Sequence, residues 1–140
     1  DLYSGTGTIA IHLSDQAEEI VGIEINKDSV ADARNNCRIN DITNCRFLEG
    51  DIKDCLSQLD RQPDVMIIDP PRSGMHKKVV EQILVMAPDR IVYVSCNPAT
   101  LARDLALLKE TYTVEQIQPV DMFPHTYHIE AVALLDRKRE

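Results

Sequence analysis

Short apolar runs alternate along the chain with longer segments in which apolar residues recur every three or four positions. The runs cover residues 20–24, 45–49, 65–68 and 91–95 and are rich in β-forming side chains. Apolar residues at steps of three and four form one stripe on a helix, whereas a short continuous run is typical of a strand buried on both faces. Strands separated by helices predict an α/β fold with a Rossmann-like, doubly wound, mostly parallel sheet.

The helical segments each predict one apolar face, and two of them carry a signal for their first residue. Asn26 precedes one helix, and Asn97 followed by Pro98 precedes another. An asparagine side chain accepts a hydrogen bond from the first turn, and proline is suited to the first helical position because an N–H there has no partner in the helix. The residues expected to face the sheet are, for three helices in turn, Val30, Ala33 and Cys37; Val80, Leu84 and Ala87; and Leu101, Leu105 and Leu108.

Both ends of the pattern depart from this alternation. Residues 1–7 look like the end of a strand that runs into a glycine turn, so we expect the first strand to be truncated. Residues 112–120 and 128–135 are two β-like runs with no helical segment between them. Such a pair most simply forms an antiparallel hairpin at the edge of the sheet.

The composition is that of one globular domain, residues 1–140, and it argues against several classes of protein. Of the 140 residues 44% are hydrophobic, and no apolar run approaches the roughly 18 residues of a membrane-spanning helix. The four cysteines are widely spaced without a C-x-x-C pair, which argues against a zinc site and a disulfide framework and favours reduced thiols in a cytoplasmic protein. The net charge of −8 is unlike that of a domain that grips nucleic acid by its phosphates.

The residues that follow each predicted strand are the first candidates for a ligand site, because ligands of such sheets bind beyond the carboxyl ends of the strands. Residues 4–8 read SGTGT, whose glycines permit either a purely structural turn or the close approach of a ligand. Glu24 is placed to accept hydrogen bonds from ribose hydroxyls, or else to stabilise a helix start. Asp51 suits an amino group such as that of adenine. Two acids beside the turn favour a nucleoside without phosphate, such as an S-adenosyl ligand, over a dinucleotide.

Three further candidates stand in the second half of the chain. Asp69 precedes two prolines, which stop sheet pairing and stiffen the turn, so this segment is either a rigid exit or the wall of an active site. Cys96 ends a strand just before a helix, whose N-terminus favours the thiolate, whereas most free cysteines are structural, as Cys37 is expected to be. Glu130 interrupts an apolar run and is either a functional acid or a solvent-facing residue on an edge strand.

Four segments, taken together, resemble the RNA 5-methyluridine (uracil-5-)-methyltransferase family. They are DLYSGTG at residues 1–7, DPPRSG at 69–74, SCNPATLARD at 95–104 and FPHTYHIE at 123–130. The resemblance covers essentially the whole chain and implies the family's C-terminal catalytic domain, with the class I methyltransferase fold and S-adenosylmethionine as cofactor. Ser4 and Thr8 depart from the cysteine and asparagine common in the family, and both keep a small polar side chain.

The resemblance also has implications for partners. It implies an RNA substrate, tRNA or rRNA, that is gripped mainly by N-terminal RNA-binding and intermediate domains outside this segment. Some members of the family carry an iron–sulfur cluster held by clustered cysteines. The cysteines of this segment are not clustered, so no metal is expected here.

The resemblance further implies roles for individual residues. Cys96 would be the nucleophile that adds to carbon 6 of uracil, so that carbon 5 can take the methyl group, and Glu130 the base that then removes the proton from carbon 5. The uracil would be unpaired or flipped out of its helix, with Phe123 and Pro124 as an apolar surface beside it. The residues implied around the cofactor are Tyr3, Gly5, Gly7, Thr8, Glu24, Asp51 and Asp69.

Two other functions are compatible with the pattern. An amino-group methyltransferase of nucleic acid could use the Asp-Pro-Pro turn at residues 69–71 without any nucleophile. A cofactor-binding module that needs further domains to engage RNA would also account for the acidic charge. A requirement for the Cys96 thiol distinguishes a uracil-5-methyltransferase from an amino-group methyltransferase, because the latter does not need the thiol.

Overall fold

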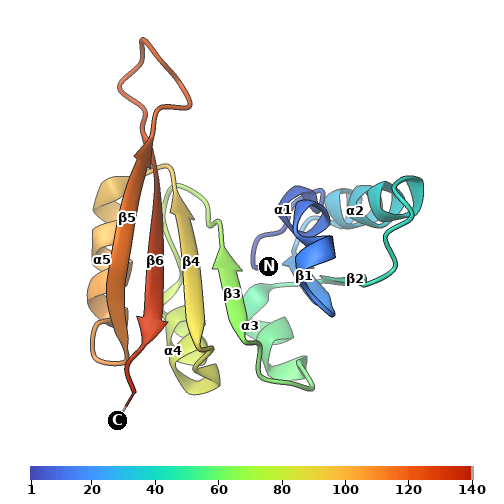
Figure 1. Ribbon diagram of the computed structural model, residues 1–140, viewed down its shortest axis with the longest axis horizontal. Helices are drawn as coiled ribbons and strands as arrows, with labels where there is room; N and C mark the ends of the chain where they lie inside the picture. Colours follow the sequence, from blue (N-terminus) through green and yellow to red (C-terminus); the bar gives the residue numbers. More distant parts are fainter. Residues whose placement is uncertain (140) are drawn as a thin grey trace. The chain divides into compact units, whose positions relative to one another are not determined.

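The computed structural model describes residues 1–139, which form two compact units, Asp1–Leu59 and residues 60–139. Each unit is described by itself. None of the helices in the described part of the chain is long and apolar enough to cross a membrane. The elements, labelled in Figure 1, are α1 (Thr8–His12), β1 (Ile20–Glu24), α2 (Lys27–Ile39), β2 (Cys45–Glu49), α3 (Ile52–Cys55), β3 (Val65–Ile68), α4 (Lys77–Met86), β4 (Arg90–Ser95), α5 (Pro98–Leu108), β5 (Tyr112–Val120) and β6 (Glu130–Arg137), with short 3-10 turns at Ser14–Gln16 and Leu56–Gln58.

The first unit is built on a parallel pair of strands with helices packed against it. β1 pairs with β2 in a register that sets Glu24 opposite Glu49, and Leu2 forms a single parallel bridge with Ile23. The bridge agrees with the expectation that the chain enters as the end of a strand. The core contains Ala10 of α1, Phe47 of β2 and the predicted stripe of α2, which is confirmed as Val30, Ala33 and Cys37.

The glycines of the first unit let the ring of Phe47 approach the backbone. A Cβ atom on Gly22 would lie 2.5 Å from the Phe47 ring, and one on Gly7 would lie 2.8 Å from it. Both distances are shorter than carbon atoms tolerate, so a side chain at either position would displace the ring. The same ring therefore packs against β1 and against the start of α1, and it fixes where the glycine turn lies relative to the strand.

The second unit is a four-stranded sheet in the order β3-β4-β6-β5. β3 and β4 are parallel, whereas β6 runs antiparallel to both β4 and β5. The predicted C-terminal hairpin is therefore confirmed, with β5 at the edge and β6 between it and β4 (Figure 1). The pairing of β5 with β6 shifts between Val114 and Gln116, which makes an irregularity in the edge strand.

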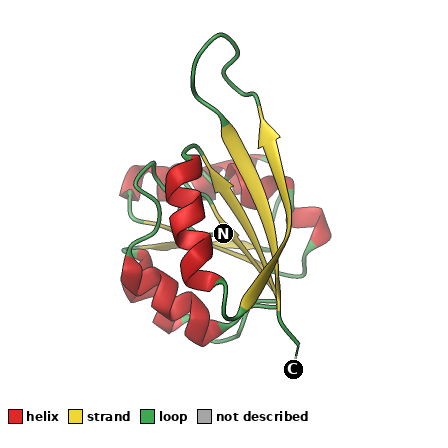
Figure 2. Cartoon of the chain, turned by 90° about the vertical axis from the view of Figure 1, so that its left-hand side faces the viewer, coloured by secondary structure: helices red, strands yellow, loops and turns green. Residues whose placement is uncertain are grey.

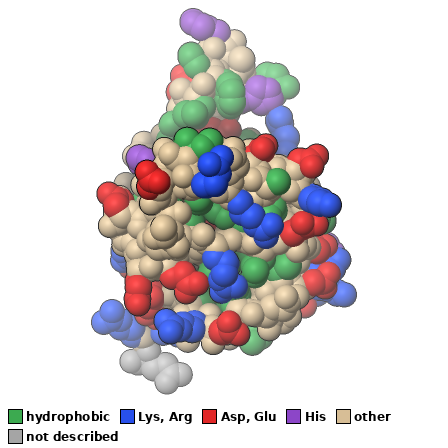
Figure 3. Space-filling view, turned by 90° about the vertical axis from the view of Figure 1, so that its right-hand side faces the viewer, with side chains coloured by type: hydrophobic (Ala, Val, Ile, Leu, Met, Phe, Trp, Pro, Cys, Tyr) green, Lys and Arg blue, Asp and Glu red, His purple; other side chains and the backbone are tan. Residues whose placement is uncertain are grey.

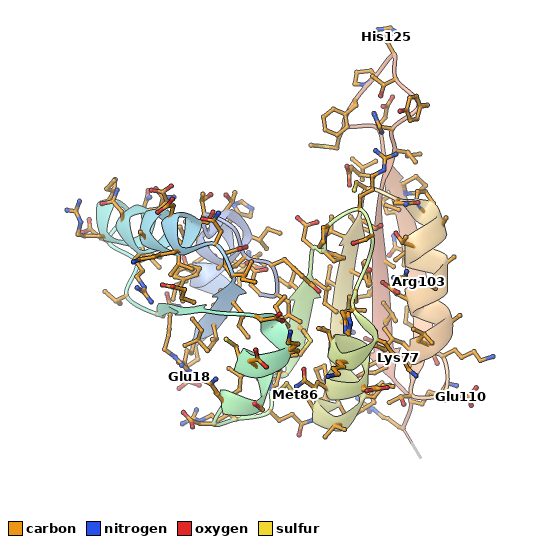
Figure 4. All side chains as sticks on the ribbon, turned by 180° about the vertical axis from the view of Figure 1, so that it is seen from behind. Glu18, Lys77, Met86, Arg103, Glu110 and His125 are labelled. Atoms are coloured by element: carbon orange, nitrogen blue, oxygen red, sulfur yellow. The ribbon has the colours of Figure 1, made fainter. Side chains whose placement is uncertain are left out.

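Helices α4 and α5 cover one face of this sheet, as Figures 2 and 4 show from two sides. On that face the sheet buries residues of alternating position, because successive side chains of a strand point to opposite faces. β4 contributes Ile91, Tyr93 and Ser95, and β6 contributes residues 131, 133 and 135. Tyr112, at the start of β5, donates a hydrogen bond from its hydroxyl to the carbonyl of Pro88 at 2.9 Å.

The predicted apolar stripes of α4 and α5 are correct only in part. In α4 the buried residues are Val79, Val80 and Ile83 rather than Val80, Leu84 and Ala87. Ala87 lies outside the helix, because its φ of 48° is the left-handed conformation that ends it. In α5 the buried residues are Leu101, Asp104 and Leu108, and Leu105 is only half-buried. Asp104 is not part of the predicted stripe, because that stripe consists of apolar positions alone.

The caps of the helices follow the prediction. The Asn26 side chain accepts a hydrogen bond from the backbone N–H of Ser29 at 3.0 Å, and the Asn97 side chain accepts one from Ala99 at 3.1 Å. Pro98 occupies the first position of α5. These local signals set where α2 and α5 begin, and α5 begins two residues after Cys96.

We predict that Gly22→Ala destabilises the protein by about 2 kcal/mol, because the added methyl group collides with the Phe47 ring and forces it out of its site. The free energy of unfolding, measured by urea denaturation, tests this. Ile25→Ala is the control, since Ile25 is exposed and its truncation is expected to change the stability by less than about 0.5 kcal/mol. Equal stability of Gly22→Ala and the unmodified protein would contradict the packing described for Phe47.

Candidate functional site

The glycine turn of the first unit has a backbone that only few residue types adopt easily. Tyr3, Gly5 and Gly7 have positive φ values of 64°, 53° and 81°. The turn closes through a hydrogen bond from the N–H of Gly7 to the carbonyl of Ser4 at 2.9 Å. Since Tyr3 has a Cβ atom, its left-handed conformation is uncommon and must be held by its surroundings. The turn then leads directly into α1, which begins at Thr8.

Glu24 holds this turn from the end of β1. One carboxylate oxygen accepts a hydrogen bond from the N–H of Gly5 at 3.0 Å, and the other accepts one from Asn26 at 2.7 Å. The helix-start interpretation and the ligand interpretation are therefore compatible, because each carboxylate oxygen can accept a further hydrogen bond. Glu24 thus couples the glycine turn to the residues that begin α2.

Asp51 follows β2 at the same edge of the pair of strands as Glu24. The N–H of Gly50 donates to the carbonyl of Glu24 at 2.9 Å, which ties the two strand ends together. The Asp51 carboxylate accepts a hydrogen bond from the N–H of Lys53 at 3.1 Å and forms an ion pair with the Lys53 ammonium at 2.9 Å. Asp51 is therefore also the N-cap of α3.

Two buried polar groups beside the glycine turn were not singled out from the sequence. Among residues 1–139, neither carboxylate oxygen of Asp1 nor the hydroxyl oxygen of Ser4 has a hydrogen-bond partner. A buried carboxylate without a donor is costly, so this position suits a ligand that brings a positively charged or donor group. The signal in the sequence is an acid just before the glycine turn, whereas only the acids that follow strands were considered.

In the second unit, the register of the sheet brings Cys96 and Glu130 together. β4 and β6 pair from Arg90 opposite Asp136 to Ser95 opposite Ala131. Cys96 is the residue that follows this last pair on β4, and Glu130 is the residue that precedes it on β6. Opposing residues of an antiparallel pair have Cα atoms about 4.5–5.5 Å apart and place their side chains on the same face. Both residues are half-buried and stand next to the last pair of the ladder, so they lie at the same end of the sheet.

The backbone around Cys96 is fixed by the residues on either side of it. The hydroxyl of Ser95 donates to the carbonyl of Asn97 at 3.0 Å and accepts from the N–H of Asn97 at 3.1 Å. Asn97 in turn caps α5. The thiol therefore lies in a short turn that is braced at the strand end and at the helix start.

The other three cysteines have a different environment. Burial raises the pKa of the Cys37, Cys45 and Cys55 thiols, and that of Cys45 reaches about 11 with a further contribution from the neighbouring Cys37. A thiol with a raised pKa stays protonated at neutral pH and is a poor nucleophile. Cys37 is buried on the inner face of α2, as the structural interpretation expects.

Asp69 stands at the end of β3, the other neighbour of β4. Ile68 pairs with Tyr93, so Asp69 follows the last rung of the parallel ladder. Partial burial, and secondly the negative charge of Glu130, raise the pKa of the Asp69 carboxyl above its ordinary value. The strand order β3-β4-β6 therefore brings Asp69, Cys96 and Glu130 to the end of the sheet where β3 and β4 finish and β6 begins.

The loop between β5 and β6, residues 121–129, projects beyond the sheet and carries exposed rings (Figures 2 and 3). Tyr127 is 86% exposed and Phe123 is 50% exposed. The His128 ring contacts both, with centroid distances of 4.3 Å to Tyr127 and 6.4 Å to Phe123. His125, with a φ of 71°, lies at the tip, labelled in Figure 4. The loop leads directly into Glu130.

The predicted site residues thus fall into two groups. The first unit brings together the glycine turn with the ends of β1 and β2, and the second unit brings together the ends of β3 and β4 with the start of β6. The first group consists of Tyr3, Gly5, Gly7, Thr8, Glu24 and Asp51, and the second of Asp69, Cys96 and Glu130.

Comparison with known protein families gives two matches along the chain. The family described as tRNA (Uracil-5-)-methyltransferase matches residues 54–138, and a general methyltransferase domain family matches residues 1–86. The first match covers the second group of site residues, and the second covers the first group.

Curated relatives agree with these matches. Proteins described as uncharacterized RNA methyltransferases are 56% identical in Bacteroides thetaiotaomicron and 53% identical in Porphyromonas gingivalis, over 97% and 100% of this chain. The chain spans 31% of the length of each of these relatives.

Among solved structures, the Pyrococcus abyssi tRNA (uracil-54, C5)-methyltransferase in complex with S-adenosyl-L-homocysteine matches with a TM-score of 0.84 and 38% identity. The match covers 96% of this chain and 33% of that one. The expected class I methyltransferase fold, with its parallel strands and antiparallel C-terminal hairpin, is confirmed by this likeness.

We predict that Glu130→Gln lowers the pKa of Asp69 towards its ordinary value of 3.8, because one of the two causes of the upward shift is the charge of Glu130. Titration of the Asp69 carboxyl carbon by NMR measures this. An unchanged titration would contradict the proximity of the two groups. A raised folded-state pKa means that the ionised Asp69 opposes folding at neutral pH, and that this cost disappears as the pH falls through the folded-state pKa.

Proposed function

Since this chain belongs to the tRNA (uracil-5-)-methyltransferase family, we propose that it is the catalytic part of an enzyme that methylates carbon 5 of a uridine in tRNA or rRNA. The observation that carries the proposal is the antiparallel pairing of β4 with β6, because Cys96 and Glu130 are the residues next to its last pair, Ser95 and Ala131. A nucleophile and a base on neighbouring strands can act on adjacent carbon atoms of one ring. The rest of the protein, about two thirds of the length of its relatives, is expected to bind most of the RNA.

Carbon 5 of uracil is a poor nucleophile, and the role of Cys96 is to activate it. Addition of the thiolate to carbon 6 forms a carbon–sulfur bond and moves the electron pair of the carbon 5–carbon 6 double bond into an enolate. Carbon 5 then carries the electron density needed to take a methyl group. The turn that Ser95 and Asn97 brace keeps the sulfur atom at the end of β4.

Glu130 completes the reaction by removing the proton from carbon 5. Once that proton has moved to the carboxylate, the double bond forms again and the thiolate leaves carbon 6. The base must therefore lie beside the nucleophile and near carbon 5, which suits a residue one strand away from Cys96. The negative charge of Glu130 contributes to the raised pKa of the Asp69 carboxyl group. Asp69 is suited to orienting the polar edge of the ring.

The first unit fits S-adenosylmethionine, which supplies the methyl group on a positively charged sulfur. The glycine turn offers a backbone without side chains at Gly5 and Gly7, and Glu24 and Asp51 keep oxygen atoms at the strand ends for hydroxyl and amino groups. The orphaned carboxylate of Asp1 suits the amino group of the methionine moiety. Phosphate is absent from this cofactor, which agrees with the acidic character of the turn.

The projecting loop supports an RNA substrate with an unpaired base. Phe123 and Tyr127 are exposed on the loop that precedes Glu130, and a terminal nitrogen of Arg72 lies 3.3 Å from the Nδ1 atom of His128. Aromatic and guanidinium planes stack on unpaired bases, and this mode of binding needs little positive charge. We therefore expect the loop to hold the nucleotides beside the target and not the phosphates.

We predict that Cys96→Ala lowers turnover by at least about 10⁴-fold and abolishes the covalent RNA adduct, because no other group on the sheet edge can add to carbon 6. Glu130→Gln is expected to form the adduct and accumulate it, because the proton on carbon 5 stays in place. Denaturing electrophoresis and mass spectrometry of the complete protein with uridine-containing RNA detect the adduct at residue 96.

Cys45→Ala is the matched control for the loss of a thiol. Its sulfur contacts the carbonyl of Ala10 at 3.6 Å and the Cys37 thiol inside the first unit, so turnover is expected to stay within about threefold. Normal turnover of Cys96→Ala without an adduct would favour an amino-group methyltransferase instead. Cofactor binding without any RNA turnover by the complete protein would favour the binding-module alternative.

We predict that Tyr127→Ala raises the KM for RNA about tenfold, because one base loses its stacking partner, whereas Tyr127→Phe keeps the ring and changes the KM little. The dependence of the affinity on salt should be the same in both variants, since no phosphate contact is lost. Filter binding at several salt concentrations checks both statements. A reduced salt dependence in Tyr127→Ala would show that the loop contacts phosphates and would contradict the stacking role.

A further inference from the structure

Asp104 is a charged residue in the buried stripe of α5 to which the proposed reaction assigns no role. Its side chain is 0% exposed. One carboxylate oxygen accepts hydrogen bonds from the Tyr93 hydroxyl at 2.6 Å and from the N–H of Met75 at 2.9 Å. The other accepts one from the Nε atom of Arg103 at 2.9 Å. An ion pair in such a position rarely stabilises a fold more than apolar side chains would, so its retention points to a positional role.

The pair of Arg103 and Asp104 grips the backbone that follows Asp69. Arg103, labelled in Figure 4, donates from one terminal nitrogen to the carbonyl of Ser73 at 3.0 Å and to that of Met75 at 3.3 Å. Together with the bond from the N–H of Met75 to Asp104, these contacts hold residues 73–75 at three points. The loop has no strand partner there, so side chains satisfy its backbone groups.

Gly74 shows how closely the loop lies on this pair. Its φ is 76°, and a Cβ atom would come within 2.5 Å of the terminal nitrogen of Arg103 and within 2.7 Å of the Asp104 carboxylate. Both the conformation and the lack of space require glycine here. The backbone of the loop therefore rests directly on the two charged side chains.

The first turn of α5 holds the same loop at a second place. The Asn97 side-chain amide and the Thr100 hydroxyl both donate to the carbonyl of Arg72, at 3.3 Å and 3.2 Å. Since α5 starts directly after the turn of Cys96, one helix binds the segment that carries Asp69 and also ends the segment that carries the thiol.

We infer that Asp104 is a positioning residue that acts through Met75 and Arg103, fixing the loop of residues 69–75 on α5 so that Asp69 stays beside Glu130 and Cys96. The inference rests on the proposed function, because the residues it positions are those of the proposed reaction. Asp104 itself is buried, and both its carboxylate oxygens accept hydrogen bonds from protein donors.

A double-mutant cycle between Asp104→Asn and Asp69→Asn tests the inference in the complete protein. We expect Asp104→Asn to lower kcat/KM for a uridine-containing RNA about 30-fold when Asp69 is present, and less than about threefold when residue 69 is already asparagine. The loss is smaller in the second background because the carboxyl group that Asp104 positions is no longer there. Equal factors in both backgrounds would overturn the positioning role and leave Asp104 as a purely structural residue.

Tyr93→Phe is the matched control. It removes a donor to the same carboxylate oxygen while the contacts of Met75 and Arg103 with Asp104 remain, so it lowers the melting temperature while kcat/KM stays within about threefold. Should Asp104→Asn fail to fold, Arg103→Gln replaces it in the cycle, because Arg103 is half-exposed and its loss frees the carbonyls of Ser73 and Met75. We then expect Arg103→Gln to lower kcat/KM more when Asp69 is present than when residue 69 is asparagine. Equal factors in the two backgrounds would overturn the inference.

Amide hydrogen exchange separates this inference from the proposed function. Asparagine keeps only one of the two carboxylate oxygens, so in Asp104→Asn either the N–H of Met75 or Arg103 faces an N–H donor in place of its acceptor. Exchange at residues 73–75 should therefore accelerate at least about tenfold, with the amide of Ile91 in β4 unchanged. If the unmodified protein fails to methylate uridine but this acceleration occurs, only the proposed reaction is wrong. Unchanged exchange at residues 73–75 would show that Asp104 does not hold the loop, whatever the activity.

Discussion

The antiparallel pairing of β4 with β6 is the constraint on which the proposed chemistry depends. Parallel strands alone would bring together only residues that end strands, because all their carboxyl ends meet at one edge. The reversed direction of β6 brings a strand start to that edge. Glu130 can therefore stand opposite Cys96 although 33 residues separate them (130 − 96 − 1). A shift of the register by one residue would turn one of the two side chains to the other face.

The helix that follows this edge gives the second constraint. α5 begins where the turn of Cys96 ends, and its inner face carries Leu101 and Leu108 against the sheet with Asp104 between them. Side chains of its N-cap and of its first two turns contact the same neighbouring loop, residues 72–75. Close apolar packing thus holds α5 on the sheet, and directional hydrogen bonds hold the neighbouring loop on α5.

Much of the fold follows from local sequence signals. The four apolar runs became strands within one residue of their predicted bounds, and Asn26 and Asn97 begin helices, because these features depend on neighbours in the chain. The site residues came from the resemblance of short motifs, but their mutual placement did not. The opposition of Cys96 and Glu130 is a property of a register between distant strands, and the role of Asp104 depends on a loop nearly 30 residues away. The spacing of apolar residues contains neither of these relations. The end of α4, in contrast, has a local signal, because Pro88 disfavours the helical conformation at Ala87.

The irregular pairing of β5 has a consequence for the solution behaviour of the protein. An outer strand of nine residues with half-exposed Val114 and Ile117 offers a template to which another extended chain could add. The shift between Val114 and Gln116 interrupts the straight row of backbone donors, and Pro119 removes one of them altogether. The sheet thus carries its own protection against edge-to-edge self-association, and the hairpin can extend a loop into solvent without seeding aggregation.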